Sequence, residues 1–311
     1  MPSRVPPAET PRRGALRLWL PVVAGIVLAG CHPGNEEAKR LNRACEAGDA
    51  VACSGLGQKL LKGEYVLRDE TRAASLLKKA CEGGVAEGCA RLGVLNQSGT
   101  GIARDSALAL SHFRRGCDGG AMDGCTRLGL LYRQGAGVPH DPARAATLFQ
   151  QACDGGSVTG CAHLGHLYAA GEGVGQDIAK AAALFQQSCD AKAPPGCLGL
   201  GRLTAAGTGI ARNDSVAMVL YERACDGREV AGCFLLGKGY ETGTGVKQNF
   251  EMAADLYRSA CSGRHGEACF TLAEMYQRGA GVNQSSERAA SMTRRACELG
   301  YVAACPAPKG S

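Results

Sequence analysis

Apolar residues recur at a fixed spacing after seven cysteines that stand 36 residues apart, from Cys53 to Cys269. After Cys125, for example, Leu128, Leu131 and Tyr132 occupy the third, sixth and seventh positions. These positions share one face of an α-helix, so the pattern predicts an amphipathic helix, which we call helix A. The residue at the fourth position is small, which predicts close contact with a neighbouring helix. It is Ala273 in the last copy and glycine in earlier copies, for example Gly93, Gly129, Gly165, Gly201 and Gly237.

A second helix, helix B, is predicted to follow each helix A. Ten residues after the cysteine a glycine is expected to end helix A in all seven copies, from Gly63 to Gly279. Helix B then runs to the next cysteine, with alanine eight positions before that cysteine and with inward apolar pairs such as Leu148 and Phe149. The residues expected to cap the start of helix B are Asp69, Asp105, Asp141, Asp177, Asn213, Asn249 and Ser285.

Sixteen of the 17 cysteines form eight pairs whose members are eight residues apart. A continuous helix would separate such residues by about 12 Å along its axis, whereas the Cα atoms of a disulfide lie roughly 4.4–6.8 Å apart. Glycines between the cysteines, such as Gly119 and Gly120, allow the chain to reverse, so the spacing predicts a disulfide across each corner between helix B and the next helix A. Zinc binding is the alternative, but paired zinc ligands usually lie two to four residues apart. The predicted disulfides are Cys45–Cys53, Cys81–Cys89, Cys117–Cys125, Cys153–Cys161, Cys189–Cys197, Cys225–Cys233, Cys261–Cys269 and Cys297–Cys305.

The first 30 residues resemble a secretory signal peptide. Arg12, Arg13 and Arg17 precede an apolar run over residues 18–28, which is too short to span a bilayer comfortably. The run ends in Leu-Ala-Gly followed by Cys31, which resembles a bacterial lipobox, where the cysteine is lipid-modified and becomes the new N-terminus. We therefore expect cleavage after residue 30 and lipidation of Cys31, the one cysteine outside the pairs. An uncleaved apolar helix with an incidental cysteine is the alternative.

The repeated unit resembles the Sel1-like repeat, a relative of the tetratricopeptide repeat. The resemblance rests on the pattern Leu-Gly-x-x-Tyr-x-x-Gly-x-Gly-Val-x-x-Asp-x-x-x-Ala over residues 128–145, and the added cysteine pairs are similar to those of the Helicobacter cysteine-rich proteins. It implies an all-α, right-handed superhelical solenoid of antiparallel helix pairs over residues 36–305. This array would follow a signal peptide (1–30) and a lipidated linker (31–35) and precede a short tail (306–311). The first loop departs from the pattern, because Glu64 and Tyr65 replace x-Gly. Residues 36–44 are expected to form a lone helix B, and Pro306 and Pro308 to prevent a further helix A.

The resemblance also implies a concave groove lined by helix A, a surface that commonly binds peptides or protein segments. The second and fifth positions after the cysteine lie away from the apolar face, and stacking of the repeats would align them. We hypothesise that this ladder binds an anionic or carboxylate-bearing protein or peptide; an ordinary solvated face is the alternative. The residues of the ladder are Arg91, Arg127, His163, His166, Arg202 and Lys238.

Evidence for catalysis is sparse in the sequence. The cysteine-rich relatives are associated with penicillin binding and weak β-lactam hydrolysis, and Ser75 and Lys78 match Ser-x-x-Lys, but the Ser-Asp-Asn and Lys-Thr-Gly motifs that complete such a site are missing. His163 and His166 could bind a metal from one helix face, yet without a third ligand we interpret them as surface residues. We expect no catalytic residues, cofactor or metal, and keep a β-lactam-binding or β-lactam-hydrolysing protein as the alternative function.

Charge and targeting features indicate the partners and the compartment. Removal of residues 1–30 would lower the formal net charge at pH 7 from +6 to 31 − 28 = +3, which is too small to indicate a nucleic-acid-binding protein, because such a protein needs clustered basic residues. His32 follows the lipobox cysteine in place of the Asp that signals inner-membrane retention in many Gram-negative bacteria. We therefore expect a lipid-anchored protein of the bacterial cell envelope, in the outer membrane facing the periplasm, that binds protein or peptide partners.

Overall fold

The computed structural model describes residues 33–305, which form fifteen α-helices and one short 3-10 segment, with no β-strand within these residues. The predicted signal peptide, the lipidation site Cys31 and the tail at 306–311 lie outside the described residues. The elements are α2 (Pro33–Glu46), α3 (Ala50–Lys62), α4 (Glu70–Glu82), α5 (Ala86–Ser98), α6 (Ser106–Asp118), α7 (Met122–Gln134), α8 (Pro142–Asp154), α9 (Val158–Ala170), α10 (Ile178–Asp190), α11 (Pro194–Ala206), α12 (Asp214–Asp226), α13 (Val230–Thr242), α14 (Phe250–Ser262), α15 (Gly266–Arg278), α16 (Ser286–Glu298) and η2 (Val302–Ala304).

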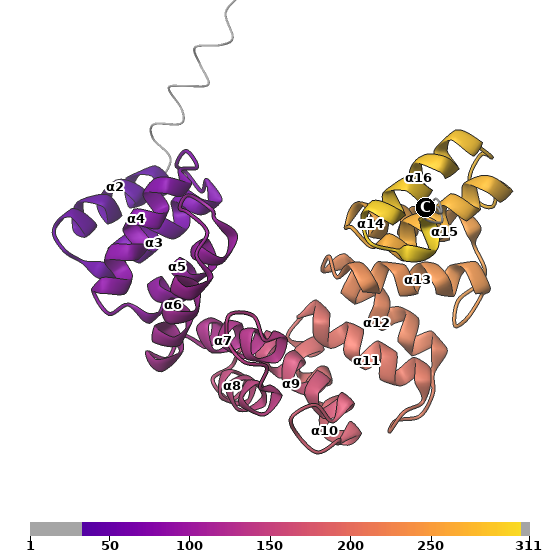
Figure 1. Cartoon of the computed structure of the whole chain (residues 1–311), viewed down its shortest axis with the longest axis horizontal. Coiled ribbons are helices and arrows are strands. Elements are labelled where there is room, and N and C mark those ends of the chain that lie inside the picture. Colours follow the sequence, from indigo (N-terminus) through magenta and orange to yellow (C-terminus); the bar gives the residue numbers. More distant parts are fainter. Residues whose placement is uncertain (1–32, 306–311) are drawn as a thin grey trace, which may run out of the picture.

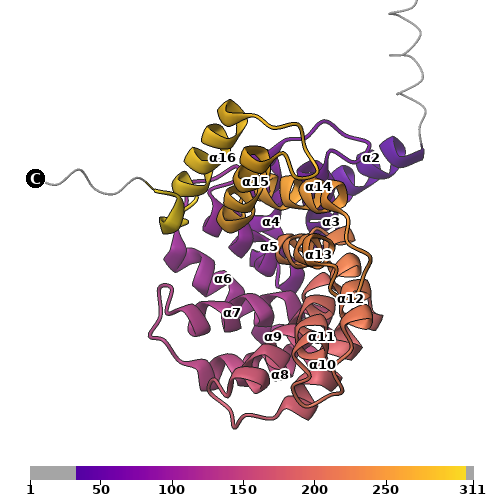
Figure 2. The same ribbon diagram turned by 90° about the vertical axis from the view of Figure 1, so that its right-hand side faces the viewer.

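The helices form the predicted solenoid of repeated pairs. The odd-numbered helices from α3 to α15 are helix A and the even-numbered helices from α4 to α16 are helix B, each of 13 residues. The pairs follow one another around a U-shaped superhelix, in which α7 and α9 face the hollow while α8 and α10 lie on the outer side (Figure 1). In the view turned by 90°, the helices of the two ends overlap at the top, while α8 and α10 lie at the bottom of the U (Figure 2). In this middle part of the array helix A therefore lines the concave face, as the sequence predicts.

The N-terminal helix α2 is the lone helix B that we expected, but it is longer. It begins at Pro33, so residues 33–35 belong to the helix and not to the linker predicted for 31–35. A proline is tolerated in the first turn of a helix, where its missing N–H has no intrahelical partner, and Glu36 adds a favourable acidic side chain near the N-terminus. At the other end the chain turns into η2 after α16, so no eighth helix A forms within the described residues.

The predicted helix starts and stops are confirmed. Asp105, for example, caps α6 by accepting a hydrogen bond from the Leu108 N–H at 2.9 Å, and the equivalent residue caps every other helix B from α4 to α16. Each helix A ends at a glycine with left-handed backbone, such as Gly135 with φ of 66°. Each capping oxygen satisfies a backbone donor that the helix itself leaves without a partner.

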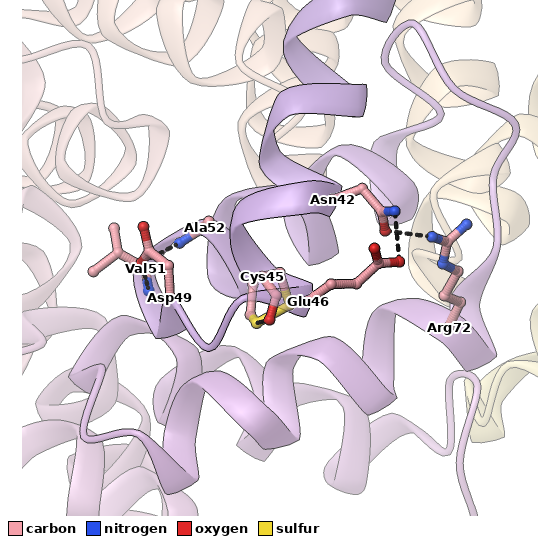
Figure 3. The surroundings of a disulfide bond; sticks show 8 residues. Asn42, Cys45, Glu46, Asp49, Val51, Ala52 and Arg72 are labelled. Atoms are coloured by element: carbon pink, nitrogen blue, oxygen red, sulfur yellow. Dashed lines mark hydrogen bonds between the residues drawn. A yellow bond between two sulfur atoms is a disulfide. The ribbon is translucent and has the colours of Figure 1, made fainter.

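All eight predicted disulfides are present and close the corners between one repeat and the next. Their Cα–Cα distances lie between 4.4 and 4.8 Å. Figure 3 shows the first corner, where Cys45 at the end of α2 pairs with Cys53 and the Asp49 carboxylate accepts hydrogen bonds from the N–H groups of Val51 and Ala52. Each of the first seven disulfides thus fixes a helix B against the helix A that follows it, and the eighth connects α16 to Cys305 after η2.

The two glycines of a corner have different roles. Only the second is left-handed, as in Gly120 with φ of 91°, and it makes the chain reversal possible. The first, Gly119, has an ordinary φ of −83°, but a Cβ atom there would lie 2.7 Å from the Cβ of Ala86 on the preceding helix A. In three later corners Lys192, Arg228 and Arg264 occupy the left-handed position instead of glycine.

The core repeats with the same period. The alanine of helix B is at most 1 % exposed in all seven copies, and the helix A leucines pack against it. The small fourth residue of helix A makes room for a ring of helix B: a Cβ at Gly129 would lie 2.6 Å from a ring carbon of Phe149. In the last repeat, where Ala273 replaces this glycine, the helix B position equivalent to Phe149 holds Thr293. The loss of the ring explains why a larger residue fits there.

The first loop keeps its shape despite its altered sequence. Tyr65, which stands in place of the glycine of the other copies, adopts the same left-handed backbone with φ of 60°. Such a conformation is unfavourable for a residue with a Cβ atom, so this loop is strained relative to its counterparts.

Candidate functional site

The first two cations of the predicted ladder are already paired with carboxylates of their own helices. The Arg91 guanidinium lies 2.7 Å from Glu87 on α5, and Arg127 lies 3.7 Å from Asp123 on α7. Both pairs have the i, i+4 spacing at which helix side chains meet. These two arginines therefore present little uncompensated charge to a partner.

His163 and His166 are not the surface residues that we predicted. Both are partly buried on α9: the His163 ring lies 5.1 Å from the Phe149 ring, and the His166 ring lies 4.8 Å from Phe185. Burial lowers the pKa of each imidazole to about 4, and nearby positive charges, with Arg133 among them for both, lower it further. Both histidines are thus neutral near pH 7, and Nδ1 of His163 is buried without a hydrogen-bond partner among the described residues.

Arg202 on α11 and Lys238 on α13 are the exposed cations of the ladder. Neither forms an ion pair within residues 33–305, and Lys238 lies 5.6 Å above the ring of Phe234. Burial lowers the pKa of His166 and of His265, which belong to different repeats, and the charge of Arg202 lowers both further. Among the residues of the ladder, the uncompensated positive charge is therefore concentrated on α11 and α13.

Arg133 is a residue of this face that the sequence pattern did not single out. It stands eight positions after Cys125, near both histidines, and its guanidinium lies 3.7 Å from the carboxylate of Glu172 in the next repeat. The helix spacing could have identified Arg133, because it follows Leu130, the fifth position after Cys125, by three residues, which is about one helical turn.

Ser75 and Lys78 lie on the opposite, helix B side of the array. Both are exposed on α4 and line a cavity of about 620 Å³ between α4 and α6. No hydrogen bond joins them within the described residues, and Lys78 instead lies 4.0 Å from Glu82. A serine nucleophile needs a base within hydrogen-bond reach, so this arrangement provides no activated serine.

The remaining chemistry of the described residues is limited. Residues 33–305 contain no group of three or more His, Cys, Asp or Glu side chains placed to hold a metal ion. None of the helices in that range combines the length and the apolar character needed to cross a bilayer.

Comparison with known proteins identifies the repeats. The family model described as the Sel1 repeat matches seven stretches, at residues 50–85, 86–120, 123–157, 158–192, 194–228, 230–265 and 266–301. Each stretch contains one helix A and its helix B, so each disulfide connects one repeat to its neighbour or to a terminal segment. No curated protein sequence matches the chain significantly.

Solved structures share the fold. A protective antigen of uropathogenic Escherichia coli, described as displaying this repeat fold, is 25 % identical with a TM-score of 0.63; the match covers 86 % of this chain and 57 % of the antigen, so this chain spans little more than half of that protein. A Sel1 repeat protein from Oxalobacter formigenes is 23 % identical with a TM-score of 0.64, covering 90 % of this chain and 82 % of that protein. Cysteine-rich protein B of Helicobacter pylori is 27 % identical with a TM-score of 0.35, covering 42 % of this chain and 93 % of that protein. The chain belongs to the Sel1 repeat family, whose helical arrays typically mediate protein–protein interactions.

Proposed function

We propose that this protein is an exported, lipid-anchored scaffold of the bacterial cell envelope that binds protein or peptide partners on its concave helix A face. The observation that carries the proposal is the division of the cysteines: sixteen form corner disulfides, and the seventeenth, Cys31, stands at the lipobox-like sequence. Structural disulfides persist in oxidising compartments outside the cytosol, which supports export.

The partner is a segment that carries carboxylates. Arg202 and Lys238 supply exposed, unpaired positive charge on the concave face, whereas Arg91 and Arg127 are neutralised by Glu87 and Asp123. A carboxylate between α11 and α13 would gain charge-assisted hydrogen bonds from these two side chains. The partner-binding centre of the predicted ladder is therefore its C-terminal half.

Binding of the purified, oxidised protein to an array of acidic and neutral peptides tests this assignment. The variant Arg202→Ser, Lys238→Ser should lose binding to acidic peptides, while the matched control Arg91→Ser, Arg127→Ser should keep it. Equal loss in both variants, or binding that ignores peptide charge, would contradict the proposal.

The anchor is tested separately in cells. We expect the wild-type protein to incorporate labelled fatty acid and to fractionate with the outer membrane, since His32 follows Cys31. Cys31→Ser should incorporate no label and keep its uncleaved N-terminal segment. Labelling that persists in this variant would show that another residue carries the lipid.

A further inference from the structure

The groove between the helices B of the first two repeats contains a cavity whose lining differs from that of its counterparts. The cavity of about 620 Å³ is bounded by α4 and α6, with α5 between them and the loop at 101–105 along one side. This volume is typical of a site for one small ligand or one large side chain. No second or fifth position of a helix A lines the cavity, so it is separate from the concave face of the proposed function.

The chain's own repeats show how this cavity arises. Seven positions after the cysteine, four copies of helix A carry a tyrosine, and Tyr132 and Tyr276 are only 5 % and 7 % exposed in their grooves. The second repeat has Asn96 at this position. Five positions before the next cysteine, most copies of helix B carry leucine, but the same repeat has His112. In the second repeat Asn96 thus replaces the tyrosine ring and His112 replaces the leucine side chain, and the cavity lies beside these two polar side chains.

The two replacements contact each other. Nδ1 of His112 lies 3.0 Å from Oδ1 of Asn96, and Asn96 is only 4 % exposed. Burial lowers the pKa of His112 below its usual range, so the imidazole is neutral near pH 7. An amide oxygen can only accept, so the imidazole carries its proton on Nδ1 and donates it to Oδ1 of Asn96.

What remains is one donor group and one acceptor atom, neither of which forms a hydrogen bond within the described residues. With Nδ1 protonated, the Asn96 amide nitrogen is the free donor and Nε2 of His112 is the free acceptor. A hydroxyl group, which donates one hydrogen bond and accepts another, satisfies both.

The residues at the walls and the rim of the cavity further restrict the kind of ligand that would fit. Leu92, Ile102 and Leu108 line the cavity, and Leu108 stands where Arg144 and Lys180 lie over the tyrosine rings of later repeats. At the rim Arg104 is exposed and has no ion pair within residues 33–305, whereas the Asp105 carboxylate is occupied in capping α6. The apolar walls would fit a phenol ring, the Asn96–His112 pair would bind its hydroxyl, and Arg104 at the rim would pair with a carboxylate next to the ring.

We propose that this groove binds a tyrosine-like group, a phenol ring with an adjacent carboxylate, in the place that the chain's own tyrosine fills in four other repeats. The phenol hydroxyl would bind Asn96 and His112, the ring would contact Leu92, Ile102 and Leu108, and the carboxylate would pair with Arg104 at the rim. The ligand is either a free aromatic acid or a tyrosine at the end of a partner chain, because both carry this chemistry.

Calorimetric titration of the purified, oxidised full chain with N-acetyl-L-tyrosine tests the site. We expect millimolar affinity, weakened about tenfold for N-acetyl-L-phenylalanine, because loss of the hydroxyl leaves the buried pair without partners. N-acetyl-L-tyrosinamide should bind several-fold more weakly than the acid, and Arg104→Gln should abolish that difference. No binding, or equal affinity for the tyrosine and phenylalanine ligands, overturns the proposal.

The variant Asn96→Tyr, His112→Leu restores the residues of the other repeats, so it should fold and should weaken binding at least tenfold. The control Thr204→Tyr fills the equivalent groove of a later repeat, where a cavity of about 510 Å³ lies, and should leave binding unchanged. Binding that survives the first variant, or is lost in the second, would place the ligand elsewhere. A peptide ending in tyrosine that binds more tightly than N-acetyl-L-tyrosine assigns the ligand to a partner chain, and the reverse order assigns it to a small molecule.

Discussion

The contact between Gly129 on α7 and Phe149 on α8 predicts that Gly129→Ala destabilises the protein, although alanine is the better helix former. A Cβ at residue 129 would lie 2.6 and 2.9 Å from two ring carbons of Phe149, about 1 Å inside ordinary carbon–carbon contact. The Phe149 side chain is fully buried and has little room to move. Overpacking of this kind costs about 1–3 kcal/mol, whereas replacing a helical glycine by alanine gains roughly 1 kcal/mol. We therefore expect a net loss of about 1 kcal/mol.

The last repeat indicates how the sign of this effect can be reversed. There Ala273 faces Thr293, the pair that takes the place of Gly129 and Phe149. In a Phe149→Thr background the clash disappears, so Gly129→Ala should stabilise by up to about 1 kcal/mol while Phe149→Thr alone destabilises through the cavity it leaves. The double-mutant cycle should thus give a coupling energy of about 2 kcal/mol between the two positions.

Urea unfolding of the four oxidised proteins, followed by far-UV circular dichroism, measures the cycle. The comparison uses midpoints at matched m-values, because long repeat arrays need not unfold in a single step. If Gly129→Ala stabilises the wild-type protein as much as it stabilises the Phe149→Thr variant, the glycine is not required by the ring, and the packing explanation of the fourth helix A position is wrong.

Three further predictions concern ionisation, corners and backbone strain. Folding lowers the pKa values of His163 and His166 from the ordinary 6.5 to about 4, so between these pH values the unfolded chain binds more protons than the folded protein. The free energy of unfolding should therefore decrease as the pH falls from about 6.5 to about 4. NMR titration of the two imidazoles checks the pKa values, and urea midpoints across this pH range check the stability. Replacing Cys117 and Cys125 by serine should cost about 2.5 kcal/mol, the chain-entropy value for a loop of this size, and should lower the urea midpoint without loss of helix content. Arg228→Gly should raise the midpoint by the equivalent of about 1 kcal/mol, since residue 228 has φ of 67°, and an unchanged midpoint would show that the arginine makes compensating contacts.

Much of the fold was predictable because the same 36-residue unit occurs seven times. Helix caps such as Asp105, helix ends such as Gly135 and the disulfide corners each follow from local rules that apply in every copy. The corner glycines were only half understood: both were expected to allow the reversal, but Gly119 is needed for room beside Ala86. That requirement depends on a helix 33 residues earlier, which no local rule includes.

The concave face was less predictable than the helices that form it. The pairs of Arg91 with Glu87 and Arg127 with Asp123 could have been found from their i, i+4 spacing. The burial of His163 could not, because it depends on the neighbouring repeat. The Phe149 ring covers Gly129 in its own repeat and also contacts His163 in the next one, so a position that a helical wheel places in solvent is partly covered by an aromatic side chain.

Departures from the repeat fall into three physical classes, and only one of them creates binding capacity. Ala273 with Thr293 is a compensated packing change, which leaves the core filled. Tyr65 and Arg228 place a side chain in a left-handed turn, which costs conformational energy but adds no internal polar group. Asn96 with His112 instead replaces buried apolar volume by a hydrogen-bonded pair that has one donor and one acceptor left over beside a cavity. Such a change lowers stability unless a ligand or water satisfies the pair, so it is the departure for which a function in binding offers a physical explanation.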